Sequence, residues 1–593
     1  MRTRSSWTLL LVAAVAISTS AVLGQAPATQ QAPAGSAAAP PTAVFHVGAN
    51  LVLVDVVVTD KGKAVHGLDR NKFHLFEDGR EQPIAGFDEH QPAAAPPVLA
   101  PRSALPPHTY GNAPAYPETG VLNVLLLDGL NTPATDQMRA RQQMIEYMGK
   151  IQPGTMMAVF TLSSRLQMVT GFTTDVAQLT RAVKGQKAET PTLLAGETAP
   201  DSLDSVQGYI DDMLGSTSPL LMRQFQADIA SQMLEQRVRM TLAALKELGL
   251  YLSAIPGRKN LIWFSGSFPA AFDPVGSQAG NFRDMPAFSE DVRKTDDLLM
   301  AARVAVYPVD ARGLMTDLPY DSSNRGPISG NISGSLASFH TQLEADKTAM
   351  RQIAYQTGGQ AYLDTNGLKE AVASAVENGG SYYTLAYTPP AKKLDGQFHK
   401  IEVRLDEAGG QLSYRRGYYA DAPGKSAAKP AKTQTLSPFL AASMHGAPPA
   451  TQVLFVSRVL PAGDPQLTGP KVPDSEAGEM TASLKGAAHR YVADLKIDAR
   501  TLDFEPMPNG AHQAQIECVL VGYDADGKRL NWADATFTVP LDASQYAAVL
   551  AGGLPVRMAL DLPAGRVYLR IAVHDGIVDH SGALEVPLAV AAN

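Results

Sequence analysis

The residues whose types could carry chemistry stand at the ends of two apolar runs. The run Val121 to Leu127 is followed by Asp128-Gly129-Leu130-Asn131-Thr132. An Asp at the end of a buried strand can cap the helix that follows, and here Pro133 falls in the first turn of that helix. We expect this capping role for Asp128, although other chemistry of its carboxylate is open.

The second run, Asn260 to Phe264, is followed by Ser265-Gly266-Ser267. Both hydroxyls could donate to a carboxylate of a partner protein or to water. Serine beside glycine is also ordinary turn chemistry, and this second interpretation is favoured.

Motifs of catalysis and of nucleotide binding do not occur in the sequence. It contains no Gly-x-Ser-x-Gly, no His-Glu-x-x-His, no phosphate-binding loop and no Gly-x-Gly-x-x-Gly between a strand and a helix. His574, Asp575, Asp579 and His580 are of metal-ligand types, but their spacing fits no zinc template and is typical of a solvated turn. We therefore predict that the protein is not an enzyme and has no cofactor.

The region 119–379 alternates apolar strands with helical segments, which indicates an α/β domain with a mostly parallel sheet and helices on both faces. The predicted strands are Val121 to Leu127, Met156 to Leu162, Asn260 to Phe264, Val304 to Val309 and Gln360 to Leu363. The predicted helices are Thr135 to Ile151, Leu220 to Ala254, Asp291 to Arg303, Ala345 to Thr357 and Leu368 to Glu377. Three long polar loops, Lys187 to Pro219, Ser267 to Ser289 and Arg312 to Leu343, are candidate binding surfaces.

Short β-branched strands flank this domain on both sides, in 44–90 and in 380–419. Neither segment has enough strands to bury its apolar face, so we expect the two to pair in one β-sandwich with the α/β domain inserted between them. Residues 91–118 are rich in Pro and Ala and are predicted to be a linker, as are residues 25–43 and 420–436. The turn spacing of 437–593 predicts a second, C-terminal β-sandwich.

The first 24 residues have the pattern of a secretory signal: Arg2 and Arg4, an apolar stretch, then small residues up to Gly24. Cleavage would leave no membrane span and a periplasmic or secreted protein, while an uncleaved anchor is the alternative. The only cysteine, Cys518, cannot form an internal disulfide. A net charge of -8 argues against nucleic acid as a partner.

Four stretches of the chain resemble the von Willebrand factor A-related proteins abundant in Acidobacteria. They read VLNVLLLDGLNT from Val121, RKNLIWFSGSFP from Arg258, IAYQTGG from Ile353 and YYTLAYTPP from Tyr382. The preceding segment Val56 to Gly79 strengthens the resemblance, which covers 45–419 in all. It implies a von Willebrand factor A-like fold, resembling a Rossmann fold, and a role in binding a partner protein.

The resemblance also implies where a divalent cation such as Mg²⁺ would bind: an Asp-x-Ser-x-Ser motif after the first strand, a Thr from a second loop and an Asp after the fourth strand. Asp128 and Thr132 match the first motif and are the candidate metal ligands. Leu130 supplies no oxygen, and Ser265 follows the fourth strand where the Asp is expected. Such a site is incomplete, so we expect no specific Mg²⁺ binding. The same loops supply candidate contacts to a partner: Asp128, Asn131, Thr132, Thr173, Ser265 and Ser267.

Three functions remain open at this point. The first is an exported protein that binds an unknown protein partner in the cell envelope without a complete metal site, and this is the function that we predict. The second is a metal-dependent adhesin, which requires a bound cation. The third is a hydrolase whose site escapes the known motifs.

Overall fold

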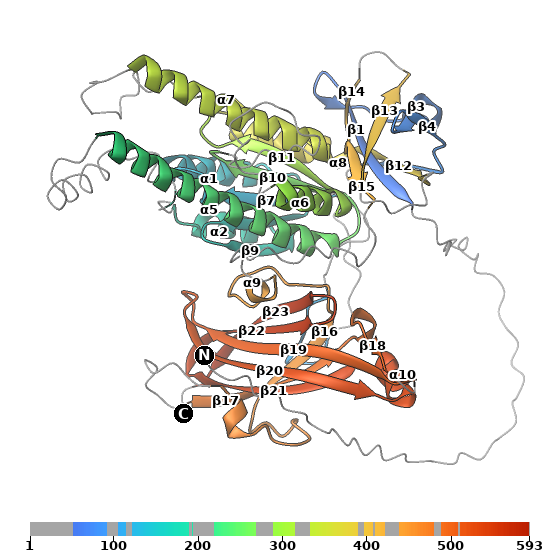
Figure 1. Ribbon diagram of the computed structural model, residues 1–593, viewed down its shortest axis with the longest axis vertical. Helices are drawn as coiled ribbons and strands as arrows, with labels where there is room; N and C mark the ends of the chain where they lie inside the picture. Colours follow the sequence, from blue (N-terminus) through green and yellow to red (C-terminus); the bar gives the residue numbers. More distant parts are fainter. Residues whose placement is uncertain are drawn as a thin grey trace, which may run out of the picture.

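The structure of the protein is a computed structural model. The structure describes residues 51–91, 105–113, 121–188, 193, 219–267, 289–314, 332–389, 397–406, 410–420, 438–478, 488–507 and 510–591. The expected signal segment 1–24, the linker 25–43 and most of the three long loops lie outside the described residues. Figure 1 shows the α/β domain beside a small β-sandwich, with a larger β-sandwich below them.

The α/β domain has a five-stranded sheet in the order β11-β10-β7-β8-β9. The pairs β11–β10, β10–β7 and β7–β8 are parallel, and β8–β9 is antiparallel. Its strands are β7 (Leu122–Asp128), β8 (Met157–Leu162), β9 (Leu166–Thr173), β10 (Lys259–Ser265) and β11 (Val304–Asp310). Its described helices are α1 (Ala134–Met148), α2 (Val176–Gly185), α5 (Pro219–Ser253), α6 (Ser289–Ala301), α7 (Ile332–Thr357) and α8 (Leu368–Gly380).

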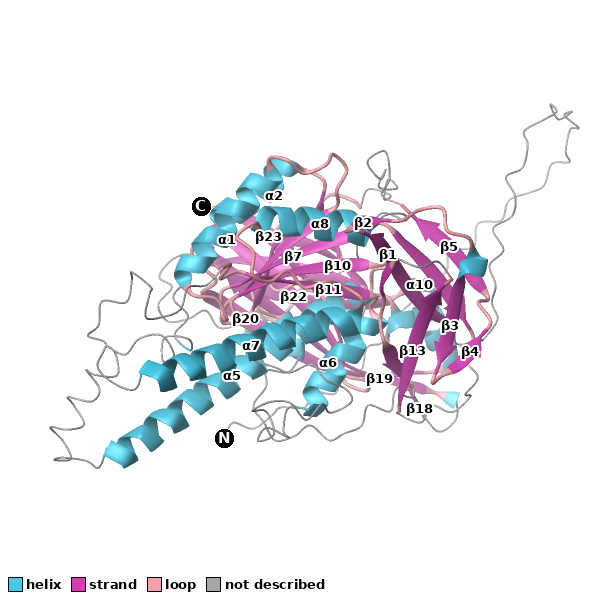
Figure 2. Cartoon of the chain, turned by 90° about the horizontal axis from the view of Figure 1, so that it is seen from above, coloured by secondary structure: helices cyan, strands magenta, loops and turns pink. Residues whose placement is uncertain are grey.

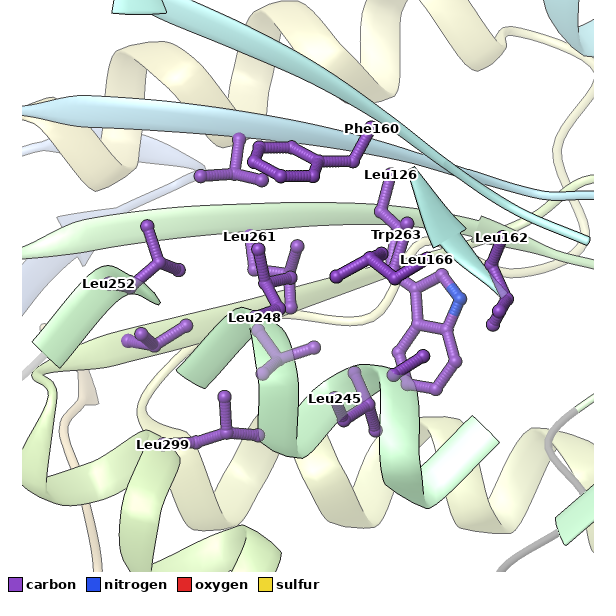
Figure 3. Close-up of a cluster of buried hydrophobic side chains, with 14 of the residues drawn as sticks. Leu126, Phe160, Leu162, Leu166, Leu245, Leu248, Leu252, Leu261, Trp263 and Leu299 are labelled. Carbon is purple, nitrogen blue, oxygen red and sulfur yellow. The ribbon is translucent and has the colours of Figure 1, made fainter. Parts of the chain in front are cut away.

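Two separate cores cover the two faces of this sheet, because successive side chains of a strand point to opposite sides. Val124 and Leu126 pack with α5, α6 and α7, whereas Leu125 packs with α1, α2 and α8. Figure 3 shows the first of these cores, in which the Trp263 indole lies among leucine side chains of α5 and the neighbouring strands. The ends of α5 and α7 project together beyond the sheet (Figure 2).

Three predicted details of this domain are wrong. Gln360 to Leu363 forms a single bridge, between Val309 and Tyr362, and not a strand of the sheet. The fifth strand is β9, a mixed polar and apolar segment that reverses direction after β8. Helix α7 begins at Ile332, inside the segment expected to be a loop.

The small sandwich joins strands from both sides of the α/β domain. One sheet has the order β14-β1-β12-β5 with β2 beside β1, and the other has the order β15-β13-β3-β4. Its N-terminal strands are β1 (Val52–Asp60), β2 (Lys63–Ala64), β3 (Phe73–Glu77), β4 (Arg80–Gln82) and β5 (Gly86–His90). The others are β12 (Tyr382–Tyr387), β13 (Phe398–Leu405), β14 (Gln411–Ser413) and β15 (Gly417–Tyr419). One core of valine, leucine and aromatic side chains lies between the two sheets.

An ion pair fixes the small sandwich to the α/β domain. Asp55 of β1 accepts hydrogen bonds from Arg303, which directly precedes β11, and from Thr384. Burial opposes ionisation of Asp55, but the hydrogen bond and charge of Arg303 outweigh it and hold the pKa of the carboxyl below its usual value. Since Arg303 lies at the amino edge of the parallel strands, the carboxyl edge faces away from this contact.

The C-terminal sandwich consists of two sheets in the orders β21-β17-β16-β6 and β18-β19-β22-β23, with β20 also paired to β19. Its strands are β6 (Thr109–Gly111), β16 (Phe455–Pro461), β17 (Ala488–Ile497), β18 (Glu505–Pro506), β19 (His512–Tyr523), β20 (Arg529–Leu541), β21 (Leu554–Pro563), β22 (Gly565–Asp575) and β23 (His580–Val590). Its helices are α9 (Pro438–Ala442) and α10 (Ala543–Gly552). Cys518 is buried in its core.

The prediction that 91–118 is only a linker is wrong. Strand β6 pairs with β16, and the buried Asn112 side chain donates to the carbonyls of Ala450 and Val453 and accepts from the Phe455 amide. A Pro- and Ala-rich composition hides a three-residue edge strand, because such a short strand is stabilised by its neighbours and not by its own propensity. The chain thus contributes to the C-terminal sandwich before it enters the α/β domain.

Candidate functional site

The carboxyl ends of β7 and β10 bring together most of the predicted site residues. The two strands are parallel neighbours, with Leu127 opposite Phe264, so Asp128 and Ser265 end adjacent strands. After β7 the chain continues to β8 on one side of this pair, and after β10 it continues to β11 on the other side. Ligands of open α/β sheets bind at such a position.

Asp128 is fully buried, and donors surround both of its carboxylate oxygens. Oδ1 accepts from the Asn131 amide at 2.9 Å. Oδ2 accepts from Asn131 Nδ2 at 2.9 Å, Trp263 Nε1 at 3.1 Å and the Ser265 hydroxyl at 2.9 Å. Burial raises the pKa of Asp128, and these hydrogen bonds oppose that rise. Asp128 does not cap α1, whose N-cap residue is Pro133 without a side-chain hydrogen bond.

A buried arginine from α5 completes this network. Arg237 is 1% exposed, and its Nε donates to Asn131 Oδ1 at 3.2 Å while a terminal nitrogen donates to Ser267 Oγ at 2.7 Å. Asn131 Nδ2 also donates to the Thr241 hydroxyl, one helical turn further along α5. The candidate residues are therefore connected to α5 by the cationic side chain of Arg237. The sequence around Arg237 contains no motif from which this role could be predicted.

The two loops at this edge are in close backbone contact. The Gly266 amide donates to the Thr132 hydroxyl at 2.9 Å, and Gln137 donates to the carbonyls of Thr132 and Gly129. A Cβ at Gly266 would lie 2.9 Å from the Asn131 carbonyl oxygen, so only glycine fits. Ser265 also lies 2.7 Å from the Ser267 carbonyl oxygen. The oxygen atoms of Thr132 and Ser265 are thus occupied by contacts within the protein.

Thr173 does not belong to this cluster. It pairs with Met157 at the start of β8, whereas Asp128 pairs with Leu162 at the end of that strand. The antiparallel direction of β9 carries Thr173 to the amino edge of the sheet, where its hydroxyl accepts from the Asp175 amide. Its placement among the candidate contacts at the carboxyl edge is therefore wrong, because the antiparallel strand β9 was not predicted.

A small cavity of about 80 Å³ opens beside Asp128, between β7, β8 and α1. Leu127, Ala140 and Phe264 supply apolar lining, and Arg141 and Lys187 supply cationic groups. Two large apolar side chains near this edge are exposed to solvent, Met138 on α1 and Leu314 after β11. The carboxyl edge therefore offers a small hollow with exposed apolar side chains near it.

A second hydrogen-bond network lies at the carboxyl end of β11. Arg312 forms two hydrogen bonds of 3.0 Å to the carboxylate of Asp310 and one of 2.8 Å to Asp346 on α7. All three side chains are largely buried, so the network attaches α7 to the sheet. The two carboxylates are occupied by the guanidinium and are structural.

Comparison with known proteins finds no matching family model and no matching curated protein. Among solved structures, an aerotolerance-related membrane protein from Bacteroides fragilis is 11% identical and covers 43% of this chain and 98% of its own, with a TM-score of 0.21. The SpRpn10 VWA domain is 9% identical and covers 43% of this chain and 94% of its own, with a TM-score of 0.19.

The three N-terminal domains of the pilus tip protein Mfa5 from Porphyromonas gingivalis are 8% identical and cover 86% of this chain and 78% of their own, with a TM-score of 0.19. Within the described residues, no helix is both long enough and apolar enough to span a membrane.

Proposed function

We propose that this is an exported protein that binds a partner protein at the carboxyl edge of its α/β sheet, and that it does so without a divalent cation at Asp128. The single observation that carries the proposal is that both carboxylate oxygens of Asp128 accept hydrogen bonds from Asn131 or Trp263, with the Ser265 hydroxyl beside them at 2.9 Å. A cation there would have to displace the Trp263 and Asn131 hydrogen bonds from a fully buried carboxylate.

Partner contact through this edge is supported by the surface next to the network. Met138 and Leu314 are 48% and 61% exposed, and the cavity beside Asp128 can receive a side chain. Exposed apolar groups near a hollow with a polar rim are typical of protein interfaces. The other candidate functions have less support. A metal-dependent adhesin needs ligand oxygens that are occupied here. A hydrolase needs a nucleophile and a base, and the sequence contains no motif that supplies them.

Cation dependence is tested by calorimetry of the purified chain with Mg²⁺ and Ca²⁺, with Asp128→Ala as the comparison variant. We expect no heat of binding that the substitution removes. A micromolar site that Asp128→Ala abolishes would contradict the proposal and favour the metal-dependent adhesin.

The binding surface is tested by capture from an envelope extract, with the immobilised chain in EDTA. We expect one protein to be retained that is lost when Met138→Asp and Leu314→Asp are combined. The matched control is Met507→Asp, at a methionine 39% exposed on the C-terminal sandwich. Equal loss with the control, or capture that occurs only when Mg²⁺ replaces the EDTA, would overturn the proposal.

A further inference from the structure

The small sandwich contains a second cluster of ligand-type side chains, far from Asp128 in both sequence and fold. Glu77 ends β3, Asp78 begins the turn to β4, and His399 lies on β13, which pairs with β3. Each of the three residues offers one ligand atom, and these three atoms all lie within 4.8 Å of one another. His399 Nδ1 lies 2.8 Å from Asp78 Oδ2 and 3.9 Å from Glu77 Oε1.

The Glu77 carboxylate is buried without a full counter-charge. Its side chain is 2% exposed, and its only basic neighbour within 4 Å among the described residues is His399. Burial and the neighbouring Glu77 raise the pKa values of Tyr387 and Tyr418, and the charge of Arg415 only partly opposes that rise. Arg415 forms no ion pair with Glu77 in the described part of the chain. An ionised carboxylate in such a place is costly unless a cation is close to it.

Groups outside the cluster hold each carboxylate so that one oxygen faces inward. Glu77 Oε2 accepts from Tyr387 at 2.5 Å and Tyr418 at 3.2 Å, while Oε1 lies 3.9 Å from His399 Nδ1. Asp78 Oδ1 accepts from the Lys400 amide at 2.9 Å, which directs Oδ2 towards His399. Outer hydrogen bonds of this kind orient metal ligands. The two oxygens that these bonds leave over, Glu77 Oε1 and Asp78 Oδ2, therefore lie on the side of His399 Nδ1.

We propose that Glu77, Asp78 and His399 bind a divalent transition-metal ion, with Zn²⁺ preferred. An imidazole nitrogen and two carboxylate oxygens are a ligand set for zinc and a poor set for Mg²⁺ or Ca²⁺, which prefer oxygen alone. Zinc bonds of about 2.1 Å in a tetrahedron place ligands about 3.4 Å apart. The separations of 2.8 Å and 3.9 Å from His399 bracket that value.

The positions of the three ligands determine how an ion would reach the site and how it would affect stability. The Asp78 side chain is half exposed and gives the ion a path from solvent. Asp78 and His399 are 321 residues apart in sequence and come from opposite sides of the α/β domain. A bound ion would therefore fasten the two parts of the small sandwich together and stabilise the native state.

The test uses the full chain, free of tags and treated with EDTA, into which Zn²⁺ is titrated in a calorimeter while thermal unfolding is followed in parallel. We expect one equivalent of zinc to bind and the unfolding temperature to rise, with weaker binding of Mn²⁺. His399→Gln and Asp78→Asn should each weaken zinc binding about tenfold or more. Circular dichroism in EDTA verifies that both variants are folded.

The matched control is His74→Gln. His74 lies in the same sandwich, with Glu81 2.8 Å from Nδ1 and Asp406 3.1 Å from Nε2, so its carboxylates lie on opposite sides of the ring and cannot share one ion with it. We expect this variant, and Asp128→Ala, to bind zinc as the unsubstituted chain does. Failure of the chain to bind zinc, or retained binding in both His399→Gln and Asp78→Asn, would overturn the proposal and leave an imidazole–carboxylate ion pair.

Discussion

Asp128 and Glu77 are both buried carboxylates at the last residue of a strand, yet their surroundings differ. Neutral donors of one domain occupy both oxygens of Asp128. At Glu77 one oxygen holds two tyrosine hydroxyls and the other faces a histidine. The comparison shows that a carboxylate at the end of a strand indicates a metal site only where protein donors leave one of its oxygens free for the metal. Whether an oxygen is left depends on donors from distant parts of the chain.

Asp296 on α6 extends the comparison to a third case. It is buried, and neither of its oxygens has a hydrogen-bond partner in the described structure. Burial and the neighbouring charge of Asp297 raise the pKa of Asp296 well above its usual value. The three carboxylates thus range from fully paired, through half paired, to unpaired.

Removal of Arg237 should have the largest effect, because it opens the closed network. Arg237→Met keeps an unbranched side chain but leaves Asn131 Oδ1 and Ser267 Oγ without a buried donor. We expect a loss of about 3 kcal/mol in the free energy of unfolding, measured by urea denaturation. The control is Arg181→Met at an exposed position of α2, which should change it by no more than about 0.5 kcal/mol. Equal losses would show that the network contributes nothing.

Tyr387→Phe weakens the half-paired carboxylate. The substitution removes the hydroxyl that donates to Glu77 at 2.5 Å, a charge-assisted bond, and should lower the free energy of unfolding by about 2 kcal/mol in EDTA. The control is Tyr355→Phe, at a tyrosine 56% exposed, where little change is expected. If Tyr387→Phe has no effect, the orientation that we assign to Glu77 is not energetically significant.

Gly266→Ala tests the close contact of the loops around Asp128. The added Cβ would lie 2.9 Å from the Asn131 carbonyl oxygen and 3.2 Å from Pro133 Cδ, which forces the loops apart. We expect a cost of about 1–2 kcal/mol in urea denaturation. Gly185→Ala, where no heavy atom lies within 4 Å of the new Cβ, serves as the control. An equal cost at the two positions would refute the contact as the cause.

Of these four substitutions, Asp296→Asn should change the free energy of unfolding least at acidic pH. Its effect on that free energy should grow as the pH rises. A carboxyl whose pKa is raised on folding stabilises the native state below the unfolded value of 3.8, and this stabilisation is lost as pH rises through the folded value. The variant has no ionisable group at position 296, so it does not lose stability in this way as the pH rises. It should match the unsubstituted chain within about 0.5 kcal/mol near pH 4 and be more stable than it at higher pH. A difference that is independent of pH would contradict the raised pKa.

Local patterns in the sequence predicted the four parallel strands β7, β8, β10 and β11 of the α/β domain, but they also gave a strand at 360–363 that is only a bridge and placed the start of α7 too late. Residues such as Val124, Leu125 and Leu126 alternate between two cores, so a run of apolar residues marks a strand buried on both faces. The family resemblance implied that Asp128 and Ser265 lie at one edge, and they do so because parallel neighbouring strands end together. Strand β6 carried no comparable signal, since its pairing with β16 depends on a strand more than three hundred residues away.

The chemistry of the candidate sites depended on the tertiary structure. Only the packing of α5 on the sheet brings Arg237 to Asn131, and only the reversal at β9 moves Thr173 to the other edge. Glu77 and His399 meet because strands from both sides of the α/β domain share a sheet. The physical reason is range: hydrophobic periodicity is encoded among neighbouring residues, whereas donors to a buried carboxylate come from whichever segments the folded chain places beside it.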